Sequence, residues 1–349
     1  MKFFILCFFV GVFFANSQVL LGIDSEPLII NIVGERNGVG WNQDIDILIT
    51  VLTDLGHDVR FVKRDLSKEE KIEVRKIIKS QNYVADINIF IEHVNKLLCY
   101  TAKKNYLLPN AEWLKLPPDQ VARFDCVLCR TKEAVRIFKP LNPNAVFMGF
   151  TCIDRFDPSV VKDYQVPLHL AGASVQKGTE TLISAWTRHS EFPFLQLVRH
   201  MGSEVVPQEA NINLIYEYLL KEELITLQNH CGLHICPSIT EGFGYYIVEG
   251  LSTEAVVVAT DAPPMNEFVL DKRCLVRYNR TKQWSEPYDY ATGYYVDEQD
   301  LEAVVANLLS LPEDELKEIG RKNRELFLQK DKEFRENIAK IFTREQVFP

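Results

Sequence analysis

The feature that most constrains the fold is a regular alternation of short apolar runs with amphipathic helical stretches. In the first half, the β-rich runs are LIINIV, VRFV, INIFIE, CVLC and AVFM. Residues 44–55 lie between the first two of these runs. Apolar side chains recur there every three or four positions, and Gly56 follows as a helix C-cap. A later helix begins at Thr131 and ends before Pro140. This βαβ order predicts a mostly parallel sheet with helices on both faces, up to about Phe150.

The same pattern starts again in the second half, after a segment rich in Asp-Pro and Val-Pro breakers. The strand candidates are LHLAG, FLQLV, NLIY, LHICPS and AVVVAT, and the helical stretches are residues 179–186, 221–229 and 245–252. A chain of 349 residues also exceeds what a single core usually serves. We therefore expect an α/β fold with two doubly wound, Rossmann-like domains facing a central cleft. The expected divisions are 18–150, a linker at 151–166, 167–311, and carboxy-terminal helices in 312–349.

The first seventeen residues have the pattern of a secretory signal peptide. Lys2 precedes the apolar run FFILCFFVGVFF, and the small residues Ala15-Asn16-Ser17 close it. An uncleaved anchor is the alternative, because Val19 to Ile23 extend the apolar stretch. No later segment is apolar and long enough to cross a membrane. The expected location is the secretory pathway or another extracytoplasmic compartment, with the mature chain starting near Gln18.

Charge and cysteine usage exclude several classes of function. The formal net charge is −9 and there is no basic stripe, which argues against nucleic acid. The densest basic stretch, residues 63–79, is interleaved with acids and predicts a solvated helix face, with peripheral membrane contact as the alternative. Cys126 and Cys129 lie in the strand-like run CVLC, where a spacing of three puts them on opposite faces. We expect buried structural thiols there, not a redox or zinc site.

The most informative stretch is EGFGYYIVE, which follows a predicted strand and opens a helix. Gly242 and Gly244 allow a ligand to approach the backbone closely, and the free N–H groups of the following helix attract negative charge. Glu241 and Glu249 are eight residues apart, so if Glu241 caps the helix, Glu249 lies about two turns inside it and roughly on the same side. Glu249 would then accept hydrogen bonds from a nucleotide ribose, and Glu241 would face the group beyond the phosphates. The alternative is an ordinary strand–turn–helix with two solvated glutamates.

Two further glycine-bearing loops follow predicted strands. One presents Ser174, Lys177 and Gly178 as hydroxyl, ammonium and backbone donors for a phosphate. The other carries Gly38 and Gly40 as a G-x-G, without the third glycine of a dinucleotide loop. Three such loops at one crevice are better explained by a diphosphate than by chance.

These motifs resemble those of the retaining nucleotide-sugar glycosyltransferases of the GT-B fold, family 4, also called glycosyl transferases group 1. EGFGYYIVE is similar to the E-x7-E motif of that family, and the upstream G-x-S-x-x-K-G is similar to its phosphate loop. The resemblance implies that Glu249 binds the ribose and that Lys177 and Ser174 hold the diphosphate. It places the donor sugar and phosphates at Glu241, Gly242, Phe243 and Gly244, beside the Gly38 and Gly40 loop, with His93 near the sugar. The candidate catalytic residues are Glu241, His93 and Lys177.

The sequence departs from the family pattern in two places. Ala173 and Ser174 stand where the family usually has an arginine ahead of Lys177, and residues 252–255 lack the usual Gly and Pro. The only D-x-D, at Asp44 and Asp46, falls inside a predicted helix, so we interpret it as surface charge and expect no metal.

The sequence therefore predicts a metal-independent retaining hexosyltransferase without a cofactor. Its donor would be a UDP- or GDP-linked sugar, whose leaving diphosphate is stabilised by helix N-termini and Lys177. The acceptor, a glycan, lipid or protein, stays open. The alternative is a catalytically silent GT-B-like protein that binds nucleotide or sugar, which the missing arginine favours.

Overall fold

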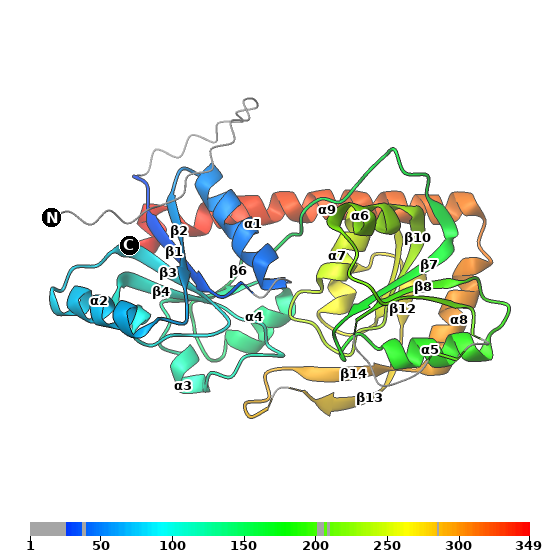
Figure 1. Cartoon of the computed structure of the whole chain (residues 1–349), viewed down its shortest axis with the longest axis horizontal. Coiled ribbons are helices and arrows are strands. Elements are labelled where there is room, and N and C mark those ends of the chain that lie inside the picture. The colour runs from blue at the N-terminus through cyan, green and yellow to red at the C-terminus, as the bar shows by residue number, and fades with distance from the viewer. Residues whose placement is uncertain (1–25, 37–39, 201–205, 208–209, 285) are drawn as a thin grey trace.

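In a computed structural model, the chain folds into two α/β domains joined by a long carboxy-terminal helix (Figure 1). The structure describes residues 26–36, 40–200, 206–207, 210–284 and 286–349. The expected signal peptide, residues 1–17, and Gly38 lie outside these ranges. None of the described helices has the length and apolarity needed to span a membrane.

The amino-terminal domain is built on a parallel sheet in the order β2-β1-β3-β4-β5-β6. Its apolar strands bury side chains on both faces, and β1, β3 and β5 are buried almost throughout, as the sequence runs predicted. Cys126 packs into one core cluster and Cys129 into another, so the two thiols point to opposite faces, as expected. The elements are β1 (Ile29–Gly34), α1 (Gly40–Asp54), β2 (Asp58–Lys63), α2 (Lys68–Lys79), β3 (Ala85–Ile91), β4 (Ala102–Leu108), α3 (Pro118–Val121), β5 (Cys126–Cys129), α4 (Lys132–Phe138) and β6 (Ala145–Phe147), with a 3₁₀ turn at Leu98–Tyr100.

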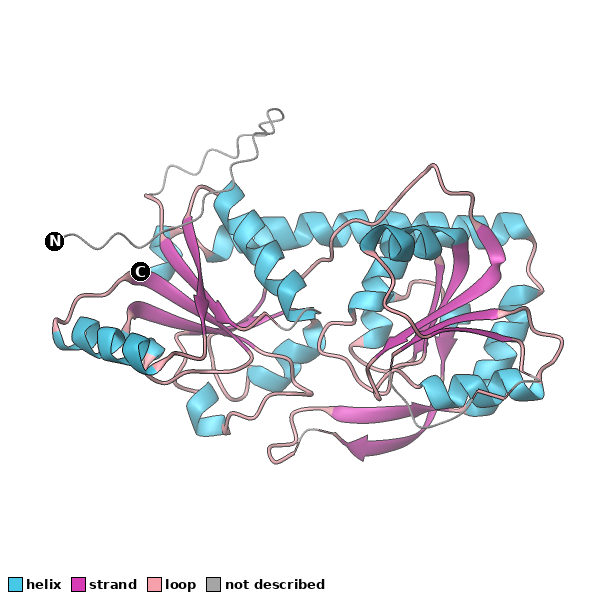
Figure 2. Cartoon of the chain, viewed as in Figure 1, coloured by secondary structure: helices cyan, strands magenta, loops and turns pink. Residues whose placement is uncertain are grey.

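The carboxy-terminal domain contains a second parallel sheet, in the order β12-β11-β10-β7-β8-β9, and a separate antiparallel hairpin, β13-β14. Figure 2 shows helices on both faces of each sheet. The sheet begins at Asp163, inside the segment expected to be the linker. The elements are β7 (Asp163–Gly172), α5 (Thr179–Arg188), β8 (Leu195–Arg199), β9 (Ile212–Ile215), α6 (Lys221–His230), β10 (Cys231–Cys236), α7 (Tyr245–Ser252), β11 (Val256–Thr260), 3₁₀ turns at Met265–Phe268 and Lys272–Cys274, β12 (Leu275–Val276), β13 (Tyr278–Gln283), β14 (Thr292–Val296) and α8 (Glu298–Leu309).

The two final helices tie the domains together. Helix α9 (Glu313–Ile341) runs from the second domain along the first, and α10 (Arg344–Val347) follows it (Figure 1). Phe334 and Ile338 are fully buried in the same cluster as strand residues of β1, and the Phe334 ring lies 5.1 Å from that of Phe150. The end of the chain therefore completes the core of the amino-terminal domain.

Candidate active site

The predicted site residues follow the strands at the reversal point of each sheet. We use this term for the place where successive strands begin to add to the other side of the first strand. In the first sheet β1 lies beside β3, and in the second β7 lies beside β10. Loops at the carboxyl ends of such neighbouring strands form the crevice where doubly wound sheets bind ligands. Gly40 and His93 follow β1 and β3, and Lys177 and Glu241 follow β7 and β10. Residues that are distant in sequence therefore lie at the carboxyl ends of the two adjacent strands at the reversal point of each domain.

Lys177 and Glu241 form an ion pair at the reversal point of the second sheet. The distance between Lys177 Nζ and Glu241 Oε1 is 2.6 Å, and both side chains are largely buried. The ammonium also lies 3.9 Å from the centre of the Tyr246 ring, and the Ser238 hydroxyl donates to the same carboxylate. Ser174 lies on the same loop as Lys177, where its hydroxyl accepts a hydrogen bond from the Gln176 backbone N–H. The Lys177 ammonium is therefore held in the loop after β7, where it can bind a negatively charged group of a ligand.

Three glycines of these loops are required by close approach or by backbone conformation. Gly178 has a φ of +69°, and a Cβ there would lie 2.1 Å from the carbonyl oxygen of Pro237. A Cβ on Gly242 would lie 2.3 Å from Asn110 Oδ1 of the other domain. Gly244, with a φ of +91°, is the N-cap residue of α7 and provides no side chain to accept from its first N–H groups. The ring of Phe243 instead packs in the core, 5.4 Å from that of Phe150.

Glu249, the predicted ribose ligand, is engaged by three other side chains. Its Oε1 is 2.6 Å from Arg155 Nη2 and accepts a longer hydrogen bond, 3.3 Å, from Gln43 of the amino-terminal domain. Its Oε2 accepts a hydrogen bond of 3.0 Å from Gln228. The residue is only 5% exposed. A ribose could reach this carboxylate only by displacing one of these partners, and the 3.3 Å contact with Gln43 is the longest.

The expectation that Asp44 carries surface charge is wrong. Asp44 is fully buried, with Oδ2 2.7 Å from Arg130 Nη2 and Oδ1 accepting a hydrogen bond of 2.6 Å from Tyr245. Arg130 is itself buried, donates to Asn110 and lies over the Phe150 ring. The side chain of Asp46, by contrast, is 52% exposed and pairs with an arginine at the surface. Asp44 therefore belongs to a buried charge pair of the amino-terminal domain, and the hydrogen bond from Tyr245 ties this pair to the start of α7.

Two buried glutamates beside this pair have raised pKa values. Burial raises the pKa of Glu92 to about 7, against the hydrogen bond from Trp41 Nε1 to its Oε2 and the charge of Arg130. Burial, together with the charges of Glu241 and Glu92, raises the pKa of Glu112 to about 8. Oε2 of Glu112 has no hydrogen-bond partner in the described part of the chain, and the same holds for Oε1 of Glu92, although Asn110 lies nearby. Neither residue is predicted from the sequence, because a lone glutamate after a strand carries no local signal.

His93 lies away from the Lys177–Glu241 pair, in a hollow lined only by residues of the amino-terminal domain. Its ring makes an edge contact with Trp41, at 5.2 Å between ring centres. Burial and the charges of Arg64 and Lys115 lower its pKa. The structure therefore connects His93 to the crevice through Trp41 and Glu92.

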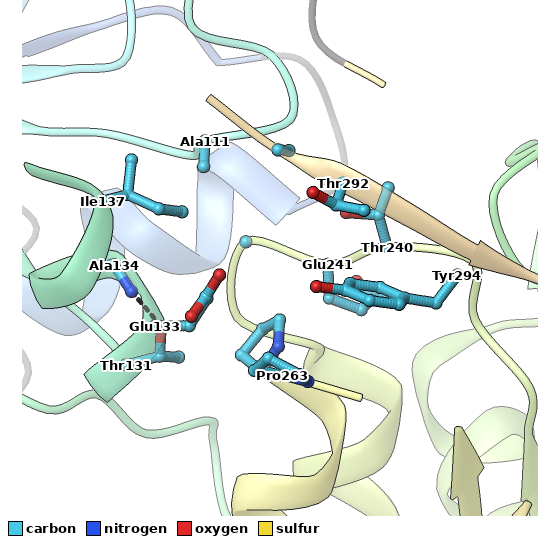
Figure 3. A pocket seen from close by; sticks show the side chains of 13 residues that line it. Ala111, Thr131, Glu133, Ala134, Ile137, Thr240, Glu241, Pro263, Thr292 and Tyr294 are labelled. Carbon is cyan, nitrogen blue, oxygen red and sulfur yellow. Dashed lines mark hydrogen bonds between the residues drawn. The ribbon is translucent and has the colours of Figure 1, made fainter. Parts of the chain in front are cut away.

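A narrow pocket lies between the two domains next to Glu241 (Figure 3). Ala111 and Ile137 line it from the amino-terminal side, and Thr240 and Tyr294 line it from the other. Helix α4, whose N-cap Thr131 accepts a hydrogen bond from Ala134 N–H as predicted, forms one wall. Among the described residues, no group of three or more His, Cys, Asp or Glu side chains is arranged to hold a metal ion.

Comparison with known proteins agrees with this geometry. The family described as Glycosyl transferases group 1 matches residues 208–327, which contain the E-x7-E motif. A comparison with curated protein sequences gives no match.

Solved structures with the same fold cover nearly the whole chain. Sucrose-phosphate synthase from Thermosynechococcus elongatus is 12% identical, with a TM-score of 0.64 over 92% of this chain and 99% of that one. Anabaena HepE, solved in complex with UDP and glucose, is 13% identical, with a TM-score of 0.63 over 90% of this chain and 98% of that one. WaaG, a glycosyltransferase involved in lipopolysaccharide biosynthesis, is 15% identical, with a TM-score of 0.60 over 90% of this chain and 100% of that one.

The fold is the GT-B fold, as the resemblance predicted. The match to the family described as Glycosyl transferases group 1 covers residues 208–327 in the second domain and includes the motif that lies at the crevice.

Proposed function

We propose that the chain transfers a hexose from a UDP- or GDP-linked donor to an acceptor hydroxyl, with retention of anomeric configuration and without a metal ion. The observation that carries this proposal is the convergence of Lys177, Glu241 and the N-terminus of α7 at the reversal point of the second sheet. The presence of UDP in the structurally similar HepE supports a nucleotide sugar as donor.

Charge explains how these residues would act. Cleavage of the glycosyl–phosphate bond leaves the bonding electron pair on the departing diphosphate, which gains one negative charge, while positive charge develops on the sugar ring. Lys177 Nζ, once released from Glu241, and the free N–H groups at the start of α7 would stabilise the diphosphate. These donors are positive without a metal ion. Glu241, close to the developing positive charge, would then hold the donor sugar.

Glu249 would bind the ribose after Gln43 leaves it. Arg155 and Gln228 would then keep the carboxylate in place while its freed lone pairs accept the ribose hydroxyls. Because Gln43 belongs to the other domain, donor binding would act on the contact between the domains.

The first experiment is a calorimetric and thermal-shift titration with UDP, GDP, ADP and their sugar conjugates, with and without chelator. Binding to the native state raises the melting temperature by mass action. We expect one nucleotide sugar to bind regardless of chelator, and Lys177→Met to weaken it, whereas the matched variant Lys332→Met, on the exposed face of α9, should bind like wild type. Proton NMR of the sugar first released to water from that donor then reports the anomeric configuration. An inverted sugar would refute retention, and a strict metal requirement would refute metal independence.

A second candidate function is that of a silent nucleotide- or sugar-binding protein. The observation that favours it is the saturation of Glu249 by Arg155, Gln228 and Gln43, together with the absence of an arginine at residues 173–174. Tight nucleotide binding without any release of sugar, to acceptor or to water, would favour this candidate. The secretory or extracytoplasmic location stays a proposal as well, and amino-terminal sequencing of the chain purified from its cells would test cleavage after Ser17.

A further inference from the structure

The hollow that contains His93 lies at the carboxyl ends of β2, β3 and β4, beside the crevice. Its volume is about 590 Å³, and its walls come from the loops that follow these three strands and from the first turn of α2. In a doubly wound sheet this edge is where ligands bind. The hollow contains none of the residues that hold the donor in the proposed function.

The walls of the hollow are strongly basic. The carboxylates among its lining residues are Asp65 and the buried Glu92. Four cationic side chains line it: Arg64, Lys71, Lys96 and Lys115. Arg64 forms two ion pairs: its Nη2 lies 3.0 Å from Asp65 Oδ2 and 2.8 Å from Glu35 Oε2. Within the described ranges, no ion pair is found for the three lysines. This local excess of positive charge contrasts with the net charge of −9 of the whole chain.

Glu92 forms the wall between the hollow and the crevice. It is 1% exposed, and its Oε1 lacks a hydrogen-bond partner within the described residues. Its other oxygen is bonded to Trp41, whose ring also contacts His93. On the crevice side stand Glu112 and Gly242, in contact across the domain boundary. A ligand in the hollow would thus lie one side chain away from the donor sugar.

We propose that this hollow binds an anionic group, a phosphate or a carboxylate, carried by the acceptor. The inference rests on the proposed transferase function and names the class of its acceptor. The lysine ammonium groups and the Arg64 guanidinium would neutralise the anion, and the partnerless Oε1 of Glu92 would accept a hydrogen bond from the neighbouring acceptor hydroxyl. The acceptor hydroxyl would then point past Glu92 toward the donor.

His93 provides a readout that is specific to this hollow. Burial and the charges of Arg64 and Lys115 lower its pKa, and the charge of Asp65 opposes them. An anion bound among the same cations would offset their charge, so the pKa of His93 should rise. Phosphate that binds only beside Lys177 would leave the His93 signal unchanged, because that site lies in the other domain.

The experiment follows the imidazole signals of His93 by two-dimensional NMR, assigned with His93→Gln, in the full chain. The soluble probes are monomethyl phosphate and glucose 6-phosphate, with glucose as the uncharged comparison. The lipid probes are phosphatidylcholine vesicles with and without phosphatidic acid, followed by co-sedimentation. The test variant is Lys96→Ala/Lys115→Ala, and its matched control is Lys332→Ala/Lys340→Ala, two exposed lysines of α9.

We expect the phosphate probes, but not glucose, to shift His93 and to raise its pKa, and the test variant to bind them at least tenfold more weakly than the control. Saturation by the soluble phosphates would assign a free anionic acceptor, whereas binding only to vesicles with phosphatidic acid, lost in the test variant, would assign a lipid headgroup. Equal affinity in test and control variants would overturn the proposal, as would an unchanged wild-type His93 signal with every probe. Nucleotide binding of the wild type is measured separately, so a failure of the transferase proposal is recognised independently.

Discussion

Replacing Glu112 by glutamine should remove a pH dependence from the stability of the amino-terminal domain. Glu112 is 8% exposed, its Oε2 has no partner among the described residues, and burial raises its pKa from 4.5 to about 8. The charges of Glu241 and Glu92 act in the same direction. Glutamine has nearly the same shape but cannot ionise.

The sign follows from the direction of this shift. A carboxyl whose pKa is raised in the folded state keeps a proton that the unfolded chain releases, so the free energy of unfolding falls as pH rises from about 4.5 to about 8 and is level above. Each pH unit in this window costs about 1.4 kcal/mol. Between about pH 5 and about pH 8, wild type should lose roughly 3 kcal/mol that the Glu112→Gln variant keeps.

The assay is urea unfolding, followed by tryptophan fluorescence, of wild type and Glu112→Gln at several pH values across this window. The control is Glu345→Gln, an exposed glutamate of α10. Glu92 titrates in both proteins, so its contribution cancels to first order. A difference between wild type and Glu112→Gln that stays constant with pH would refute the reasoning, and so would one that moves in favour of wild type as pH rises.

Three further substitutions test the packing around the site. Asp44→Ala leaves the Arg130 guanidinium buried without its carboxylate and should cost about 3–5 kcal/mol by urea unfolding; a loss below about 1 kcal/mol would mean that Arg130 finds water. Gly178→Ala, with a Cβ placed 2.1 Å from Pro237 O, should distort the loop that carries Lys177 and lower nucleotide affinity at least tenfold by calorimetry, and unchanged affinity would count against the position of that loop. Phe334→Ala should destabilise the amino-terminal domain by about 3–5 kcal/mol, measured by hydrogen exchange in β1, whereas protection equal to wild type would show that α9 is not part of this core.

The sequence predicted most elements whose pattern is local. Helix α7 has the predicted bounds, 245–252, and the α5 and α6 helices extend the predicted ranges by one or two residues, because apolar periodicity and glycine caps are local signals. Strand β4, AKKNYLL, was missed because its first half is polar and partly exposed. The β13–β14 hairpin was missed for the same reason, since every residue of β13 is exposed.

The site was predictable only as far as each motif reaches along the chain. The loops with Lys177 and Glu241 are recognisable, but their ion pair joins residues 64 positions apart. Asp44 looked like surface charge because its partner Arg130 lies 86 positions later. A buried charge depends on a partner that is distant in the sequence, and the periodicity of apolar residues does not predict which residue that partner is.

The contacts between the domains are of two kinds, and this decides how the cleft could open. At the crevice many of them are polar, beside the ring contact of Phe150 with Phe243. The polar contacts are Gln43 to Glu249, Tyr290 to a backbone carbonyl, and the Glu267 carboxylate to the first N–H groups of α4. Exchange for water has a net cost of about 0.5–1.5 kcal/mol for the Tyr290 bond and about 1.5–3 kcal/mol for each bond to a carboxylate. Along α9 the contact is apolar, and exposing Phe334 alone would cost about 1.5–3 kcal/mol. Opening that admits a donor should therefore separate the domains at the crevice and leave α9 as the hinge.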